Sequence, residues 1–358
     1  MRILLAASLL VLAACGTDVA RGAPSASAAP ARTPSPTPTI NVDDMMGQFA
    51  QQTVFVVTSE RVAAITLLNH FTRYEIPTNG TPQVALDATG AWLYVLDGPA
   101  GAARLRTFDV PNGTERASSA GIAGARVDIA NVASDRHALA TAIDGRVLVL
   151  KSDGTRAWVD AYEALSLRPL GTLFAGPNGG CADRLLSSGS RIAVLCDRSG
   201  DIAYLDVRGD RGIVEGTLPG IVAATMTEDG TIYLGTGDGA LASVPIGGTK
   251  KVARISWPSD WARTLLPDAL AVSQGWLLVA QQGDAPYLRM FQLSDQSHRQ
   301  STLLSGTPQG GILALWPFVY YTQIADRCVH HVDLIQGLLE VMRCDIGTNA
   351  RPGAVANR

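Results

Sequence analysis

A recurring β-rich segment constrains the fold of this chain more than any other sequence feature. Seven short runs with a bulky, β-forming centre appear, and their starts are separated by 39, 45, 54, 40, 45 and 42 residues. They begin at Thr53, Trp92, His137, Arg191, Thr231, Trp276 and Phe318. A period of roughly 40 to 45 residues is typical of four-stranded β-propeller blades, whereas a β-sandwich has no such period. Residues 40–358 are therefore predicted to form an all-β propeller with seven four-stranded blades.

The segment that begins at Pro82 shows the plan of one blade. Its β-rich runs are 83–87, 92–96, 104–110 and 114–120, and glycine-containing turns separate them. The residues that resemble the YVTN-type bacterial propeller repeat are Pro82, Asp87, Gly90, Leu93-Tyr94-Val95 and Phe108-Asp109-Val110. Residues 228–240 resemble a PQQ-type repeat that lacks its closing tryptophan. These resemblances imply the propeller fold, and no site residue is carried over from either family.

The two ends of the repeat region complete each other. The first set, residues 53–78, contains only three strands, and a β-capable segment at 352–357 follows the seventh set. Pairing the two within one blade would close the ring and remove an open sheet edge. Residues 40–50 are an alternative source of the missing strand.

The N-terminus predicts export and a lipid anchor. Arg2 is followed by an apolar run over 3–12, which is shorter than the roughly 20 residues that cross a bilayer and is typical of a signal peptide. The motif Leu12-Ala13-Ala14-Cys15 resembles the lipobox of bacterial lipoproteins. This resemblance implies cleavage after residue 14, diacylglyceryl transfer to the Cys15 thiol and acyl chains such as palmitate in the membrane. Alternatively, Cys15 is a chance residue in an ordinary signal peptide that is cleaved further along.

The next segment and the charge balance limit the partners of the protein. Residues 15–39 are rich in Pro, Ala, Ser and Thr and are predicted to be a disordered tether between the anchor and the propeller. The chain has 29 Lys and Arg against 32 Asp and Glu, so it carries no basic surplus that would indicate nucleic-acid binding. The expected location is the bacterial cell envelope, outside the cytoplasm and attached to a membrane.

Four cysteines besides Cys15 predict two disulfides, because disulfides persist in exported proteins. Cys181 and Cys196 bracket a predicted hairpin, and Cys328 and Cys344 bracket another. Each pair is symmetric about its own turn, so the two thiols of a pair are expected to lie opposite each other on antiparallel strands. The predicted bonds are therefore Cys181–Cys196 and Cys328–Cys344.

The sequence predicts no catalytic residues, no cofactor and no metal site. Cys-x-x-Cys, His-Glu-x-x-His, Gly-x-Ser-x-Gly and Walker motifs do not occur. His330 and His331 are adjacent, but neighbouring strand residues point to opposite faces of a sheet and cannot hold one ion together. The five histidines are otherwise scattered along the chain.

Two long connections are the candidate binding surface. Residues 158–181 and 257–268 are predicted to lie between the outer strand of one blade and the inner strand of the next, which places both loops on one face. Long loops often carry binding residues. The candidates are Trp257, Trp261, Arg263 and Tyr162. Alternatively, the two tryptophans pack between blades and only fill space.

Two classes of function fit this pattern. The first is a binding or scaffold module that docks an envelope protein or a glycan. The second is an enzyme of the lactonase, lyase or quinoprotein kind, with its site at the central channel. The predicted inner strands 84–88, 127–131, 221–225, 269–273 and 312–316 are mostly apolar, with Asp87 and Asp128 as the main acids. This lining favours binding, whereas converging carboxylates and histidines would favour the enzyme.

Overall fold

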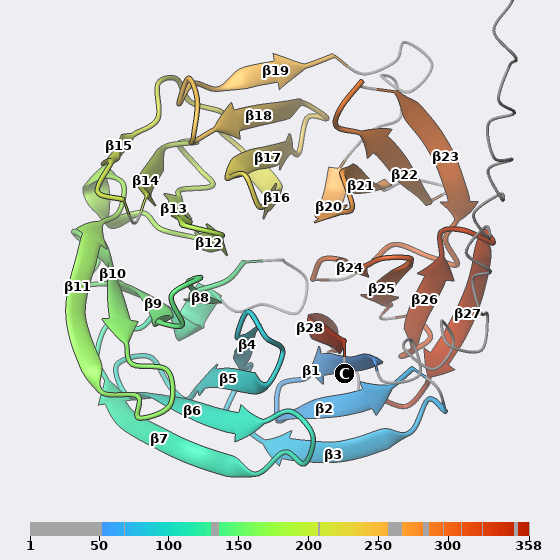
Figure 1. The fold of residues 1–358 in the computed structure, drawn as a ribbon, viewed down its shortest axis with the longest axis horizontal. Helices are drawn as coiled ribbons and strands as arrows, with labels where there is room; N and C mark the ends of the chain where they lie inside the picture. Colours follow the sequence, from blue (N-terminus) through green and yellow to red (C-terminus); the bar gives the residue numbers. More distant parts are fainter. Residues whose placement is uncertain are drawn as a thin grey trace, which may run out of the picture. The chain divides into compact units, whose positions relative to one another are not determined.

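Seven antiparallel sheets of four strands each follow one another around a ring (Figure 1). The computed structural model describes residues 52–67, 69–129, 136–206, 208–256, 267–281, 286–295, 297–308, 310–323, 325–346 and 350–357. The predicted seven-bladed propeller is therefore confirmed. No helix in these described ranges is long and apolar enough to span a lipid bilayer.

Each blade is one sheet whose four strands follow one another from the centre of the ring outward. Blade 1 consists of β28 (Arg351–Asn357), β1 (Gln52–Val57), β2 (Arg61–Thr66) and β3 (Thr72–Pro77). Blade 2 consists of β4 (Gln83–Leu86), β5 (Trp92–Asp97), β6 (Ala103–Asp109) and β7 (Glu115–Ile122). Blade 3 consists of β8 (Leu139–Thr141), β9 (Val147–Ser152), β10 (Ala157–Tyr162) and β11 (Pro169–Ala175). Blade 4 consists of β12 (Arg184–Ser188), β13 (Arg191–Leu195), β14 (Ile202–Asp206) and β15 (Arg211–Ile213).

The last three blades follow the same plan. Blade 5 consists of β16 (Ile221–Met226), β17 (Thr231–Thr236), β18 (Leu241–Pro245) and β19 (Ala253–Ile255). Blade 6 consists of β20 (Pro267–Ser273), β21 (Trp276–Gln281), β22 (Tyr287–Gln292) and β23 (His298–Leu303). Blade 7 consists of β24 (Leu313–Leu315), β25 (Phe318–Thr322), β26 (Val329–Asp333) and β27 (Leu338–Arg343). Two short 3-10 helices, η1 (Val127–Ile129) and η2 (Asn178–Gly180), lie in connections between blades.

Strand β1 shows why the second strand of a blade is apolar throughout. Phe55 and Val57 belong to a cluster shared with blade 2, whereas Val54 and Val56 belong to a cluster shared with blade 7. Successive strand residues point to opposite faces, and both faces of β1 are covered by a neighbouring blade. All six residues of β1 are therefore buried, which explains the uninterrupted β-forming runs in the sequence.

The C-terminus closes the ring, as the sequence predicts. β28 pairs antiparallel with β1 from Gln52↔Asn357 to Val57↔Arg351 and forms the inner strand of blade 1. The alternative, in which residues 40–50 supply this strand, is wrong. Gly353 permits the close approach of β28 to blade 2, because a Cβ atom there would lie 2.5 Å from Val84 Cγ2.

In blade 3, the β-rich run that marks the blade in the sequence is not the second strand. The marker at His137 lies at the inner strand β8, whereas the other six markers are the second strands of their blades; the equivalent strand of blade 3 is β9. The predicted inner strand 127–131 is also wrong, because Val127–Ile129 forms η1. The reason is that 127–131 and 138–142 have similar short apolar patterns, and only the pairing of β8 with the buried strand β9 distinguishes them.

Both predicted disulfides are present. Cys181–Cys196 spans the β12–β13 hairpin of blade 4, and Cys328–Cys344 spans the β26–β27 hairpin of blade 7. Each bond closes a loop around one turn, as the symmetric spacing predicts.

Candidate functional site

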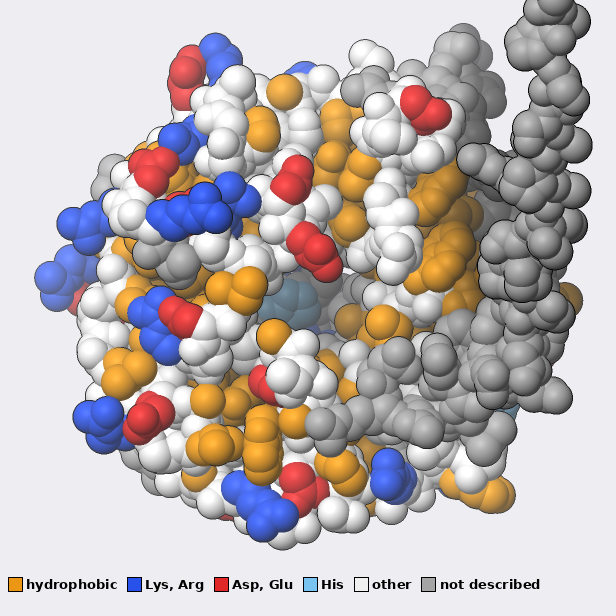
Figure 2. Space-filling view, in the orientation of Figure 1, with side chains coloured by type: hydrophobic (Ala, Val, Ile, Leu, Met, Phe, Trp, Pro, Cys, Tyr) orange, Lys and Arg blue, Asp and Glu red, His pale blue; other side chains and the backbone are white. Residues whose placement is uncertain are grey.

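Every blade contributes residues to the wall of the central channel. The inner strands or their flanking residues line a cavity of 370 Å³, and the space-filling view shows the ring hollowed at its centre with a histidine visible inside (Figure 2). Most lining side chains are small or apolar, such as Val84, Ala140, Leu186 and Ala271. The channel wall therefore carries few polar side chains, and backbone groups supply much of its polar surface.

The channel lining brings together no pair of acids in the part of the chain that the structure describes. Asp87, one of the two expected acids, holds the β4–β5 turn instead, because its carboxylate accepts a hydrogen bond from the Trp92 N–H at 2.8 Å. Asp128, the other, lies in η1 and forms an exposed ion pair with Arg126 at 2.9 Å. Neither carboxylate is placed for acid–base chemistry in the channel.

His137 is the titratable residue of the described channel lining. Burial, together with the nearby positive charge of Arg351, lowers the pKa of His137 to about 3. The imidazole is therefore neutral at physiological pH. A neutral ring can donate or accept a hydrogen bond, but it supplies no positive charge to an anionic ligand.

A polar pocket of 650 Å³ lies where the connections that precede blades 3 and 4 meet the β13–β14 turn and the start of blade 5. At its wall the carboxylate of Asp197 joins two arginines, with Arg184 Nε at 2.7 Å and Arg136 Nε at 2.8 Å. The side chains of Arg184 and Asp197 are only 2% and 5% exposed. The charge of this buried carboxylate is therefore neutralised by arginines of the protein itself.

Buried arginines connect neighbouring parts of the ring through backbone carbonyls. The guanidinium groups of Arg106, Arg126, Arg184 and Arg351 donate hydrogen bonds to the carbonyls of Pro77, Ala182, Val222 and Pro82, respectively. These links were not expected from the sequence. The sequence feature that could have indicated them is an arginine next to or inside an apolar strand, as in Arg184-Leu-Leu. The links join neighbouring blades and the connections between them.

The structure describes only one of the four residues of the predicted binding surface. Trp257, Trp261 and Arg263 lie outside the described residues. The segment 158–181 is not a long loop, because it contains β11 and most of β10. Tyr162 ends β10 and is only 4% exposed, so its assignment to an exposed loop is wrong. Its ring belongs to the core cluster between blades 2 and 3.

The adjacent histidines of β26 point to opposite faces, as the sequence predicts. His330 stacks on Tyr321 with ring centroids 5.0 Å apart, and its Nε2 lies 2.8 Å from Asp326. His331 packs instead against Phe318, at 5.4 Å. The sequence pattern did not indicate that His331 is accompanied by residues from other segments, His70 and Glu340.

Comparison with known proteins shows the fold alone. No protein-family model and no curated protein matches the chain. The structure of apo AztD from Citrobacter koseri is similar, with 12% identity, coverage of 85% of this chain and 97% of that chain, and a TM-score of 0.56. A proposed 6-phosphogluconolactonase from Bacteroides uniformis has 13% identity, coverage of 86% and 99%, and a TM-score of 0.54. Dihydro-heme d1 dehydrogenase NirN has 11% identity, coverage of 80% and 61%, and a TM-score of 0.54.

Proposed function

We propose that this protein is a lipid-anchored, extracytoplasmic binding or scaffold propeller of the bacterial cell envelope. The observation that carries the proposal is the channel, whose described lining side chains are mostly apolar and include no carboxylate. Acid–base catalysis needs titratable groups placed within hydrogen-bond reach of one substrate. A single histidine with a pKa of about 3 is a weak base, so this lining supports recognition rather than turnover.

Two features support the proposed location. The Cys181–Cys196 and Cys328–Cys344 disulfides are consistent with an oxidising compartment outside the cytoplasm. The lipobox-like motif that ends at Cys15 supports a lipid anchor on the same side of the membrane. For the anchor, metabolic acyl labelling should mark the native protein and not Cys15→Ser, and label in both proteins or in neither would contradict it.

The partner is expected to be an envelope protein or a glycan, bound in part by the 257–268 connection. Aromatic and arginine side chains commonly dominate binding energy, at about 2 kcal/mol or more for each anchor. Trp257, Trp261 and Arg263 are therefore the residues to test.

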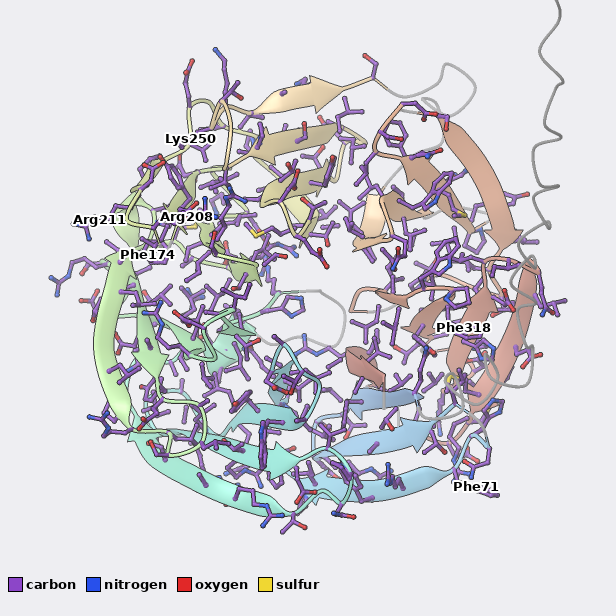
Figure 3. The ribbon with its side chains drawn as sticks, in the orientation of Figure 1. Phe71, Phe174, Arg208, Arg211, Lys250 and Phe318 are labelled. Carbon is purple, nitrogen blue, oxygen red and sulfur yellow. A yellow bond between two sulfur atoms is a disulfide. The ribbon has the colours of Figure 1, made fainter. Side chains whose placement is uncertain are left out.

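Photo-crosslinking in intact cells, followed by mass spectrometry, tests this proposal. Trp257→Ala, Trp261→Ala and Arg263→Ala should each weaken the crosslink to the partner and leave the melting temperature nearly unchanged. Arg211→Ala is the matched control, because Arg211 is an exposed arginine on the outer strand of blade 4 (Figure 3). If both tryptophan variants melt early while Arg263→Ala keeps every crosslink, the connection is structural and binds no partner.

The alternative is an enzyme of the lactonase, lyase or quinoprotein kind. One structural neighbour is a proposed 6-phosphogluconolactonase and another a dehydrogenase, but the likeness to both is in fold. Hydrolysis of a lactone that is lost in His137→Gln would favour the enzyme, because His137 is the titratable group of the described channel lining.

A further inference from the structure

Three segments distant in the sequence meet at the junction of blades 7 and 1. His331 lies in the middle of β26, Glu340 is its partner on β27, and His70 lies in the connection between β2 and β3. The Nε2 atom of His331 is 3.6 Å from a carboxylate oxygen of Glu340. The rings of His70 and His331 meet edge to face with centroids 6.0 Å apart. One ligand atom from each of these three residues lies within 4.8 Å of the other two.

The central ligand, His331, is held rigidly. It is 5% exposed, and its ring packs at 90° against Phe318 and at 6.3 Å from Tyr320. Phe318 and Phe71, the residue after His70, mark the two sides of this junction (Figure 3). The position of His331 is therefore fixed by β25 and β26 before any ligand binds.

The second histidine is presented by an unusual backbone conformation. His70 has a φ of 57°, in the left-handed region that non-glycine residues rarely adopt and that is often found at functional sites. Its N–H donates to the Thr66 carbonyl at 3.0 Å, and the Thr66 hydroxyl bonds to Asn69. This hydrogen-bonded turn directs the His70 ring toward blade 7.

The donor set suits a transition-metal cation. Two imidazoles and one carboxylate are common ligands of Zn²⁺, and three protein ligands leave a fourth position for water. An ordinary hydrogen bond does not explain the group, because 3.6 Å is too long for one and the second imidazole has no part in it. His70 and Glu340 are partly or largely exposed, so they can move the short distance that a shared ion requires.

Two other clusters in the described ranges have a similar ligand count but a different chemistry. They are Cys181, Asp183 and Cys196, and Asp326, Cys328 and His330. Each depends on sulfur atoms that are engaged in a disulfide and offer no thiolate. The cluster of His70, His331 and Glu340 contains no cysteine, so its ligand atoms are not engaged in a disulfide.

The geometry points to a binding site for one Zn²⁺ or similar divalent transition-metal ion, formed by His70, His331 and Glu340. The ion joins the connection of the first blade to the outer strands of the last blade. It thereby links the two blades at which the ring closes. Because the ligands come together only in the folded chain, binding raises the stability of the native state.

Calorimetric titration of the intact, disulfide-bonded protein with zinc chloride in a non-chelating buffer tests the site. We expect one ion per chain, and at least about tenfold weaker binding for His70→Gln and for Glu340→Gln, because metal affinity depends strongly on each ligand. Cobalt chloride provides a second readout, since its visible absorption reports the ligands directly. The buried His331 is left unchanged, because its replacement would disturb the packing of Phe318.

Two controls make the result decisive. Glu215→Gln removes another exposed carboxylate, just after the outer strand of blade 4, and His137→Gln removes an imidazole from the channel; neither should change zinc affinity. The metal-free melting temperatures of His70→Gln and Glu340→Gln should match that of the native protein. Absence of stoichiometric zinc binding, or equal affinity in the native protein and in both ligand variants, would overturn the proposal.

Discussion

The inner strands and the outer strands of this propeller carry different kinds of side chain. The second strands β1 and β21 are almost wholly buried, whereas the outer strands β11 and β27 are mostly exposed and have one buried residue each. The inner region holds a neutral histidine in an apolar channel, and the outer rim brings two histidines and a carboxylate together. The comparison indicates that the inner strands mainly stabilise the fold, whereas the outer strands can carry metal-binding side chains.

The buried arginine at the start of the inner strand β12, Arg184, provides the strongest test of the inner region. Arg184→Ala leaves the carboxylate of Asp197 buried with one partner fewer and removes the hydrogen bond to the Val222 carbonyl. Breaking a buried ion pair costs about 3–5 kcal/mol when the remaining charge is left without a partner. Asp197 keeps its ion pair with Arg136, so we expect a loss of about 3 kcal/mol in the free energy of unfolding, measured by urea denaturation.

An ion pair on the outer surface is the matched comparison. Arg156 pairs with Asp153 at 3.2 Å, but its side chain is 81% exposed. Arg156→Ala should change stability by less than about 1 kcal/mol, because exposed pairs contribute little. Equal losses in the two variants would remove the distinction between the inner region and the rim.

The two disulfides sharpen the comparison, because one lies on an inner hairpin and the other on an outer hairpin. Their sequence separations are 15 and 16 residues, so loop entropy predicts almost the same contribution, about 3 kcal/mol each. Replacing both cysteines of either pair by serine should lower the free energy of unfolding by similar amounts. A much larger loss for Cys181 and Cys196 would show that packing in the inner hairpin, rather than loop entropy, sets the effect.

The fold was more predictable than the site because blades repeat and sites do not. The buried second strands produce the periodic runs at Trp92, Thr231 and Trp276, and the closing strand follows from one incomplete set of strands. The inner strand of blade 3 could not be chosen from local pattern alone, since its pairing with β9 decides it.

Residues that meet across blades left no local signal. The rule that successive strand residues point to opposite faces of a sheet correctly separated His330 from His331. It gives no information on His70, which lies near His331 only because the first and last blades are neighbours in the closed ring. Tyr162 likewise could not be recognised as buried without the strand that it ends. Prediction from sequence therefore succeeded for the repeat and for the closing strand, and it failed at the inner strand of blade 3 and at the side-chain contacts between blades.

The smallest expected effect is the contribution of the channel histidine, His137, to the pH dependence of stability. The pKa of His137 is lowered to about 3 in the folded chain, whereas an imidazole in the unfolded chain titrates at about 6.5. The unfolded state therefore binds more protons between these values, and stability falls as the pH falls from 6.5 toward 3. His137→Gln should reduce this slope by well under the ~1.4 kcal/mol per pH unit of one full proton, because the channel side of the ring is open to water.

Urea midpoints measured between pH 7.5 and 4.5 give the two slopes. Burial also lowers the pKa of His331, so some acid sensitivity should persist in His137→Gln. His137→Phe is a second variant that removes the titrating group while it keeps a ring in the channel wall, and it should flatten the slope equally. Slopes identical to that of the native protein in both variants would mean that water in the channel solvates His137 fully. The inner region would then be as accessible to solvent as the rim, because the pKa of His137 would be the same in the folded and the unfolded chain.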